Sequence, residues 1–285
     1  MSTPSPIGSL STTPLEAAAE AERILRALDT GPPVARVVVV AGARVGQGWL
    51  VDTVGAAPLG ASPAEPVPTA VLEVAHRRLA ANAPPGTESV AEVGEVYVEV
   101  FGPPPELVIV GAGHIAVPLA RLGALLGFRV VVLDDRPEFA RRERFPEAAE
   151  VRRVDWRDPW EGLAVGARSY VVLVTRGHRY DYDALRTLLA CPDRPAYVGM
   201  IGSRRRVRAT FAALLAEGVP ATRLADVYAP IGLDIGAETP EEIAVAVAAE
   251  LVRVRRGGTG LSLRDRERVL DRFFRSGPPP NGALE

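Results

Sequence analysis

ELVIVGAGHIAVPLARLGALLGFRVVVLDD, residues 106–135, places a glycine-rich turn between an apolar strand and a helix with an apolar face. Gly111 and Gly113 stand where the chain must turn tightly and where its backbone can approach a pyrophosphate. Ala116 is the third small residue, which close packing of the helix on the strand requires. The next apolar strand ends in Asp134, about 20 residues past the glycines, where a carboxylate can contact a ribose hydroxyl. The stretch therefore predicts a site for a phosphate-bearing ligand; the alternative is a turn that only packs tightly.

After this turn the sequence continues to alternate between apolar strands and helices with one apolar face. The predicted strands cover residues 107–110, 129–133, 151–154, 170–174 and 196–200. The predicted helices cover residues 114–126, 182–189, 204–217 and 240–253. Such alternation is typical of a parallel sheet with helices on both faces. We therefore predict an α/β fold with a carboxyl-terminal, Rossmann-like, doubly wound parallel sheet, whose ligands bind beyond the carboxyl ends of the strands.

The amino-terminal half is predicted to form a smaller α/β domain. Its expected elements are a helix over 14–28, strands over 34–41 and 49–54, a loop around 58–68, a helix over 70–81 and a strand over 96–101. The Gly-Pro-Pro-Pro segment at 102–105 is short and stiff, which places the domain boundary there. The predicted organisation is a disordered segment over 1–13, the small domain over 14–102, the Rossmann-like domain over 106–257, and a short helix with a proline-rich tail over 258–285.

The composition excludes several classes of chemistry. All 33 basic residues are arginine, which excludes a Walker-type phosphate loop, a pyridoxal Schiff base and a lysine general base. Cys191 is the only cysteine, so one chain cannot form a disulfide or a cysteine-based zinc or iron–sulfur site, and we predict no metal site. A net charge of −2 gives no overall attraction for nucleic acid. Because no basic leader and no unbroken apolar run is present, we expect no export signal, no membrane span and a cytoplasmic protein.

A second polar segment, TRGHRYDYDAL at 175–185, follows a predicted strand. Thr175 begins the turn, and His178 and Asp181 follow it closely. An imidazole and carboxylates at the end of a strand can hold a polar ligand, move a proton or bind a metal, so His178 and Asp181 are candidate catalytic residues. The structural alternative is that Asp181 is a helix N-cap and that Asp183 lies in the first helical turn.

A third segment, IGSRRRVRATF at 201–211, is a candidate anion site. Gly202 and Ser203 lead into a helix whose first turn begins with Arg204. Free amides at a helix start attract anions, and arginine side chains add paired donors. The alternative is a solvated basic face.

The fourth segment, PIGLDIGAETPEEIAVAVAAEL at 230–251, combines a helix start with a glycine-punctuated loop. Thr239 is predicted to be the N-cap of the helix. That structural role does not account for Asp234 and Glu238, which precede it. We predict that this loop closes over the ligand cleft.

Together these segments resemble the carboxyl-terminal Rossmann domain of the xanthine dehydrogenase accessory protein family, XdhC/CoxI. The resemblance rests on motifs in order from about residue 107 to 257: VGAGHIA, VVVLDDRPEFA with ERFPEA, TRGHRYDYDAL, YVGMIGSRRR and PIGLDIGAETPEEIAVAVAAE. It implies a protein that binds the molybdenum cofactor, as molybdopterin or its dinucleotide form, and aids its maturation and insertion into xanthine dehydrogenase or carbon monoxide dehydrogenase. The implied partner is such a molybdenum hydroxylase, with a sulfurtransferase and a second copy of this chain as further candidates.

The residue patterns and the resemblance together give one set of candidate cofactor-binding residues. They are Gly111, Gly113, His114, Ala116, Asp134, Arg136, Thr175, His178, Gly202, Ser203, Arg204, Asp234 and Glu238. The amino-terminal half departs from the family, because GARVGQGW and PLGASPAEP stand where GSxPRxxG and GGGCxE segments are usual. The second of these family motifs carries a cysteine, and PLGASPAEP has none.

Three functions follow from these observations as hypotheses. The first is a cofactor chaperone, which would be an accessory protein and not an enzyme. The second is an NAD(P)-dependent oxidoreductase with His178 as its acid–base residue, where Asp134 favours NAD and Arg136 leaves NADP open. The third is a non-catalytic scaffold that only contacts a partner enzyme, because a fold does not determine a function.

Overall fold

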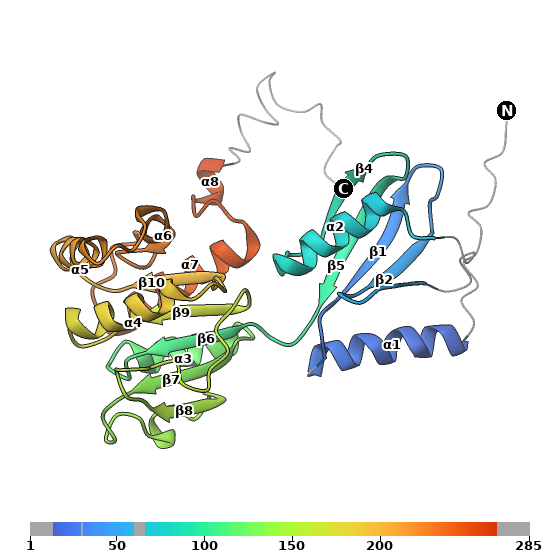
Figure 1. Ribbon diagram of the computed structural model, residues 1–285. Coiled ribbons are helices and arrows are strands. Elements are labelled where there is room, and N and C mark those ends of the chain that lie inside the picture. Colours follow the sequence, from blue (N-terminus) through green and yellow to red (C-terminus); the bar gives the residue numbers. More distant parts are fainter. Residues whose placement is uncertain (1–13, 30, 60–65, 267–285) are drawn as a thin grey trace, which may run out of the picture.

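The computed structural model describes residues 14–29, 31–59 and 66–266, which Figure 1 shows as two α/β parts joined by an extended segment. The amino-terminal part contains a five-stranded antiparallel sheet in the order β3-β2-β1-β5-β4. Its elements are α1 (Pro14–Asp29), β1 (Val34–Ala41), β2 (Gly48–Val51), β3 (Ala56–Pro58), α2 (Thr69–Ala80), β4 (Gly86–Val90) and β5 (Gly94–Phe101). Because neighbouring residues of a strand face opposite sides, Ala35 packs in the core under α2 and Val34 packs with Ala27 of α1.

The carboxyl-terminal part contains a six-stranded sheet in which every pair is parallel. Its strands are β6 (Glu106–Val110), β7 (Arg129–Asp134), β8 (Glu150–Arg153), β9 (Ser169–Leu173), β10 (Tyr197–Met200) and β11 (Val227–Tyr228). They are ordered β11-β10-β9-β6-β7-β8, so the chain moves outward from β6 to one edge and then returns to the other side of β6. This is the strand order of a Rossmann fold, and the order reverses between β6 and β9.

Helices cover both faces of this sheet (Figure 1). The helical elements are α3 (Ala116–Leu125), the short turn η1 (Arg142–Arg144), α4 (His178–Ala190), α5 (Arg204–Ala216), α6 (Ala221–Ala225), α7 (Pro240–Arg256) and α8 (Leu263–Arg266). The helices α3 and α7 pack on the face that holds Leu107 and Ile109, whereas α4 and α5 pack on the face that holds Val108 and Val110. Burial on both faces explains why the strands read as unbroken apolar runs.

The structure confirms the predicted fold class of a Rossmann-like parallel sheet with a smaller amino-terminal α/β part. One helix start was predicted wrongly, because α4 begins at His178 instead of residue 182. Five short elements were not predicted, since none has a long apolar run: β3, β4, η1, α6 and β11. The predicted disorder over 1–13, much of the loop over 58–68 and most of the carboxyl-terminal tail lie outside the described residues.

Candidate functional site

The carboxyl ends of the parallel strands bring the predicted segments to one edge of the Rossmann sheet. Gly111 follows β6, Thr175 follows β9 and Gly202 follows β10. Ile231, just past β11, donates its amide to the carbonyl of Met200 at 3.1 Å, so the fourth segment starts at the same edge. We call this edge, above the reversal point between β6 and β9, the switch-point edge.

The two glycines of the turn have different structural requirements. Gly111 has φ +103°, and a Cβ there would lie 2.7 Å from the carbonyl oxygen of Val174, so only glycine fits. A Cβ on Gly113 would meet no heavy atom within 4 Å, and its φ is not in the left-handed region. Packing and backbone conformation therefore do not require glycine at 113. The open space beside it is the kind of space into which a ligand can approach the backbone.

The turn also presents unused hydrogen-bond donors. Among the described residues, the amides of Gly113, His114 and Ile115 donate no hydrogen bond. They precede α3, whose amino end carries a partial positive charge. The imidazole of His114 is exposed beside them. Free amides at a helix start form an anion-binding site, so this turn fits a phosphate group.

Asp134 is not free to contact a ribose hydroxyl, contrary to the prediction. Its side chain is 1% exposed, and it accepts hydrogen bonds from the Ala112 amide at 2.7 Å and from the Arg136 amide at 2.9 Å. The Arg136 guanidinium adds two further bonds to the same carboxylate, each 2.9 Å long. Arg136 in turn lies over the Phe139 ring at 3.6 Å. The two predicted ligand contacts therefore hold each other and fix the shape of the glycine turn.

A salt bridge spans the switch-point edge between the loops after β7 and β9, the two neighbours of β6. The Arg176 guanidinium donates two bonds to the Asp135 carboxylate, at 2.8 and 2.9 Å. Arg176 also lies 4.1 Å from the centroid of the Tyr180 ring, which packs against Trp156 at 4.9 Å. Partial burial alone would raise the pKa of Asp135, but the bonds from Arg176 bring that pKa down to about 2. Sequence reasoning missed this group, although Asp135 stood next to the chosen acid.

Asp181 is buried in an internal network and is not a helix cap. Its Oδ1 accepts a hydrogen bond from Thr175 Oγ1 at 2.6 Å, and its Oδ2 accepts one from Arg206 Nε at 2.8 Å. The side chain is 0% exposed, and this burial raises its pKa against the opposing effect of Thr175 and Arg206. The N-cap of α4 is Gly177, and Asp183 lies beyond the first turn. Both structural expectations for these aspartates were therefore wrong.

The other candidates of the second and third segments lie at the surface of the switch-point edge. His178 is the first residue of α4 and is exposed. Ser203 is the N-cap of α5, where its hydroxyl accepts a bond from the Arg206 amide at 3.3 Å. Arg204 is exposed, whereas Arg206 points inward to Asp181. These two segments therefore place an imidazole and an exposed guanidinium near two helix starts.

The fourth segment is anchored by a buried glutamate that sequence reasoning missed. Glu250 of α7 accepts hydrogen bonds from the Gly232 amide at 2.9 Å and from the Tyr197 hydroxyl at 2.6 Å. Burial and the bond to Glu250 raise the pKa of Tyr197. Asp234 and Glu238 are both exposed, and closure of their loop over a ligand stays a prediction.

Two further searches cover only the described part of the chain. Over residues 14–29, 31–59 and 66–266 the structure brings no three His, Cys, Asp or Glu side chains together as metal ligands. In the same ranges every helix is too short or too polar to cross a bilayer.

The strand order and the glycine turn define a Rossmann-type domain. The family model of the XdhC Rossmann domain matches residues 107–251, and the chain belongs to that family. This confirms the resemblance drawn from the motifs.

Two curated relatives match part of the chain. The uncharacterized protein YqeB of Escherichia coli (strain K12) is 34% identical over 190 residues, which are 65% of this chain and 34% of that protein. A protein of Bacillus subtilis (strain 168), named as a probable xanthine dehydrogenase subunit, is 32% identical over 161 residues, which are 56% of this chain and 46% of that protein. The chain thus spans from about a third to about half of the length of these relatives.

A solved structure shares the fold. The crystal structure of a protein described as a xanthine dehydrogenase from Bacillus halodurans superposes with a TM-score of 0.62 at 24% identity. The match covers 88% of this chain and 68% of that one, so the likeness extends beyond the Rossmann domain.

Proposed function

We propose that this protein binds the molybdenum cofactor at the switch-point edge and delivers it to a xanthine dehydrogenase-type enzyme, in the cytoplasm. The observation that carries the proposal is Gly113, whose missing side chain neither packing nor backbone conformation explains. The free amides beside it suit a phosphate, which molybdopterin carries. Membership of the XdhC family and the name of the Bacillus subtilis relative support the choice of partner.

The surrounding residues suit a larger anionic ligand with a flat ring. Ser203 and Arg204 at the start of α5 can hold a second anionic group, such as the other end of a dinucleotide. The Trp156 and Tyr180 rings and the Arg176 guanidinium form a neighbouring surface on which a planar ring can stack. The bound cofactor would supply the molybdenum chemistry to the partner, and the residues of this chain bind and orient it.

The geometry favours a carrier over a catalyst. Of the two candidate catalytic residues, His178 is exposed and Asp181 is fully buried against Thr175 and Arg206. They therefore do not form a joint acid–base site at the surface. Asp134, the acid expected to select NAD, is already saturated with hydrogen bonds.

The ligand class is tested by equilibrium binding to the purified full chain. Molybdopterin, its cytosine dinucleotide, NAD(H) and NADP(H) are titrated separately, and each loaded sample is then mixed with a cofactor-free xanthine dehydrogenase-type enzyme. We expect binding of at least one molybdopterin form and recovery of hydroxylase activity in the partner. Binding of a nicotinamide cofactor with turnover, and of neither molybdopterin form, would show an oxidoreductase instead. Binding of no cofactor, with a physical complex to the partner, would show a scaffold.

A further inference from the structure

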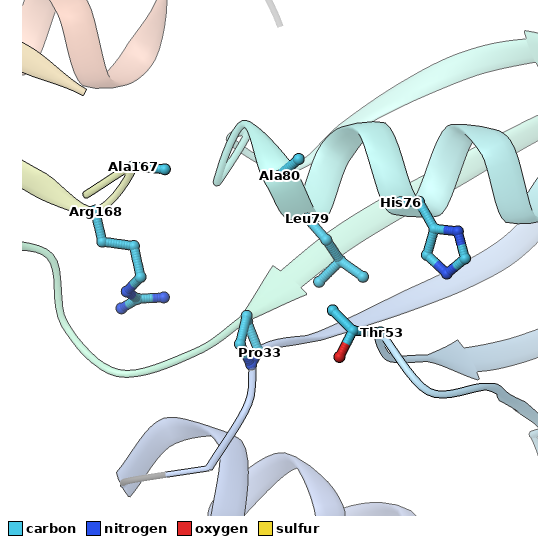
Figure 2. A pocket seen from close by; sticks show the side chains of 7 residues that line it. All are labelled: Pro33, Thr53, His76, Leu79, Ala80, Ala167 and Arg168. Carbon is cyan, nitrogen blue, oxygen red and sulfur yellow. The ribbon is translucent and has the colours of Figure 1, made fainter. Parts of the chain in front are cut away.

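A cavity lies between the two parts of the molecule, away from the switch-point edge. It has a volume of about 380 Å³ and is lined by Pro33, Thr53, His76, Leu79, Ala80, Ala167 and Arg168 (Figure 2). The first five belong to the amino-terminal part, and the last two precede β9. Residues that precede a parallel strand lie at the amino edge of the sheet. The cavity is therefore on the opposite side of the Rossmann domain from Gly113.

Arg168 is a cation without a counter-ion in this cavity. Its guanidinium makes no hydrogen bond or ion pair with any described residue, and its Nη2 atom is buried. The removal of water around it lowers the pKa of Arg168. Two other partly buried arginines of the Rossmann domain are paired with carboxylates, Arg136 with Asp134 and Arg206 with Asp181. Arg255 has a backbone partner, because it donates to the Leu126 carbonyl at 3.0 Å. A desolvated charge without a partner destabilises the folded state, and a ligand that pairs with it would remove this cost.

The surrounding chain fixes the position of this guanidinium. The Arg168 carbonyl accepts a hydrogen bond from the Glu106 amide at 3.0 Å, which ties this residue to the start of β6. A Cβ on Gly102, in the segment between the two parts, would lie 2.6 Å from Arg168 Nη1 and 3.0 Å from Pro33. Glycine at 102 thus makes room for the charged group. In Figure 2 the side chain of Arg168 extends from the Rossmann domain toward Pro33 and Leu79.

The rest of the lining is apolar or uncharged. Leu79 and Ala80 come from the last turn of α2 and form an aliphatic wall, and no acidic side chain of the described residues lines the cavity. His76 is held on the far side, where its Nε2 lies 3.2 Å from the carbonyl oxygen of Asp52. A concave, largely apolar space with one charged group is the usual form of a small-molecule site. Its volume also lies in the range of such sites, which is about 300 to 1,000 Å³.

We propose that this cavity binds a small organic acid, with its oxyanion on the Arg168 guanidinium and a compact apolar body against Leu79 and Ala80. A guanidinium fork pairs equally well with a carboxylate or a phosphate, so the shared chemistry is an oxyanion on an apolar group. Because both parts of the molecule line the cavity, the bound ligand would contact the amino-terminal part and the Rossmann domain at the same time. The proposal concerns a separate site and does not depend on cofactor binding at the switch-point edge.

The test is calorimetric titration of the full chain with two matched series. Benzoate and octanoate are carboxylates with a large apolar group, and acetate is their control with a single methyl group. Phenyl phosphate is a phosphate with an apolar group, and inorganic phosphate is its control. We expect at least one of the ligands with an apolar group to bind at least about tenfold more tightly than its control, acetate or inorganic phosphate. Arg168→Met should weaken that binding at least about tenfold, since a charge-assisted pair is lost. Arg208→Met is the matched control, because Arg208 is an exposed arginine of α5, and it should change nothing.

Two further measurements separate a ligand-binding role from a structural one. Without ligand, Arg168→Met should melt no lower than the wild type, because it removes an unpaired cation. Ala80→Trp keeps Arg168 and fills the cavity, and it should also abolish binding. Binding of only carboxylates or only phosphates would each support the site and define its ligand class. The proposal would be overturned if benzoate, octanoate and phenyl phosphate all failed to bind at millimolar concentration. Equal binding to Arg168→Met and Arg208→Met would also overturn it.

Discussion

At the scale of single residues, Gly111 and Gly113 should respond differently to the same substitution. Gly111→Ala places a Cβ against the Val174 carbonyl in a left-handed backbone conformation, and we expect a loss of about 2 kcal/mol or more in the free energy of unfolding. Gly113→Ala meets open space, so its unfolding free energy should stay within about 1 kcal/mol of the wild type. Urea denaturation of both variants measures this, and the opposite order would refute the assignment.

The buried Asp181 should matter for stability far more than its neighbour Asp183. Asp181→Asn leaves Arg206 without its carboxylate, and we expect a loss of about 3 kcal/mol, the typical cost of breaking a buried ion pair. Asp183→Asn, on the same helix, should change the free energy of unfolding by less than about 0.5 kcal/mol. Thermal and urea unfolding compare the two variants. Equal effects would show that Asp181 has no such network in solution.

The pairing of Asp135 with Arg176 should be visible in the titration of Asp135. Its pKa is about 2 in the folded protein, against an ordinary value of 3.8. A lowered carboxyl pKa means that the stability from this pair is present above about pH 4 and is lost as the pH falls through about 2. Carboxyl NMR of the wild type and of Arg176→Met measures it, and the pKa should rise in the variant. A wild-type value near 3.8 would show that the bridge is not formed.

Not all of these residue roles could be predicted from the sequence. The glycine turn was recognisable because its spacing between a strand and a helix is local. The burial of Asp134 and Asp181 could not be predicted, because it depends on the arginine with which each carboxylate pairs. For Asp181 that arginine is Arg206, which lies 25 residues further along the chain. Sequence patterns place such acids at the right edge of the sheet but do not say which way they point.

At the scale of elements, the strands of the Rossmann sheet were predictable because both of their faces are buried, which produces apolar runs. The start of α4 was not predictable, because its N-cap is Gly177, which has no side chain to cap the helix. The start of α7 was predictable, because Thr239 and Glu242 form a capping box.

That capping box gives a prediction for α7. Thr239→Ala removes the hydroxyl that accepts a hydrogen bond from the Glu242 amide at 3.2 Å. We expect a loss of about 1 kcal/mol in the free energy of unfolding. Thr239→Ser keeps the acceptor and should restore most of it. Urea denaturation of both variants measures the difference, and equal stability of the two would show that the cap is not formed.

At the scale of the whole molecule, the two edges of the Rossmann sheet carry separate proposed sites. The switch-point edge presents Gly113 and its free amides, and the amino edge presents Arg168 to the cavity shared with the amino-terminal part. The first site was expected from the alternation of strands and helices in the sequence, since ligands of such sheets bind beyond the carboxyl ends of the strands. The second depends on how the two parts pack, which no local sequence pattern contains.

The central claim is that the turn at Gly113 holds the phosphate of the molybdenum cofactor. Its most direct test is parallel titration of molybdopterin cytosine dinucleotide into the wild type, Gly113→Asp and Gly55→Asp. Both glycines have open space around the added Cβ, but Gly55 lies in the amino-terminal part. We predict that Gly113→Asp weakens binding at least about tenfold through repulsion and loss of space, whereas Gly55→Asp binds like the wild type. Equal affinity of all three proteins would contradict the account.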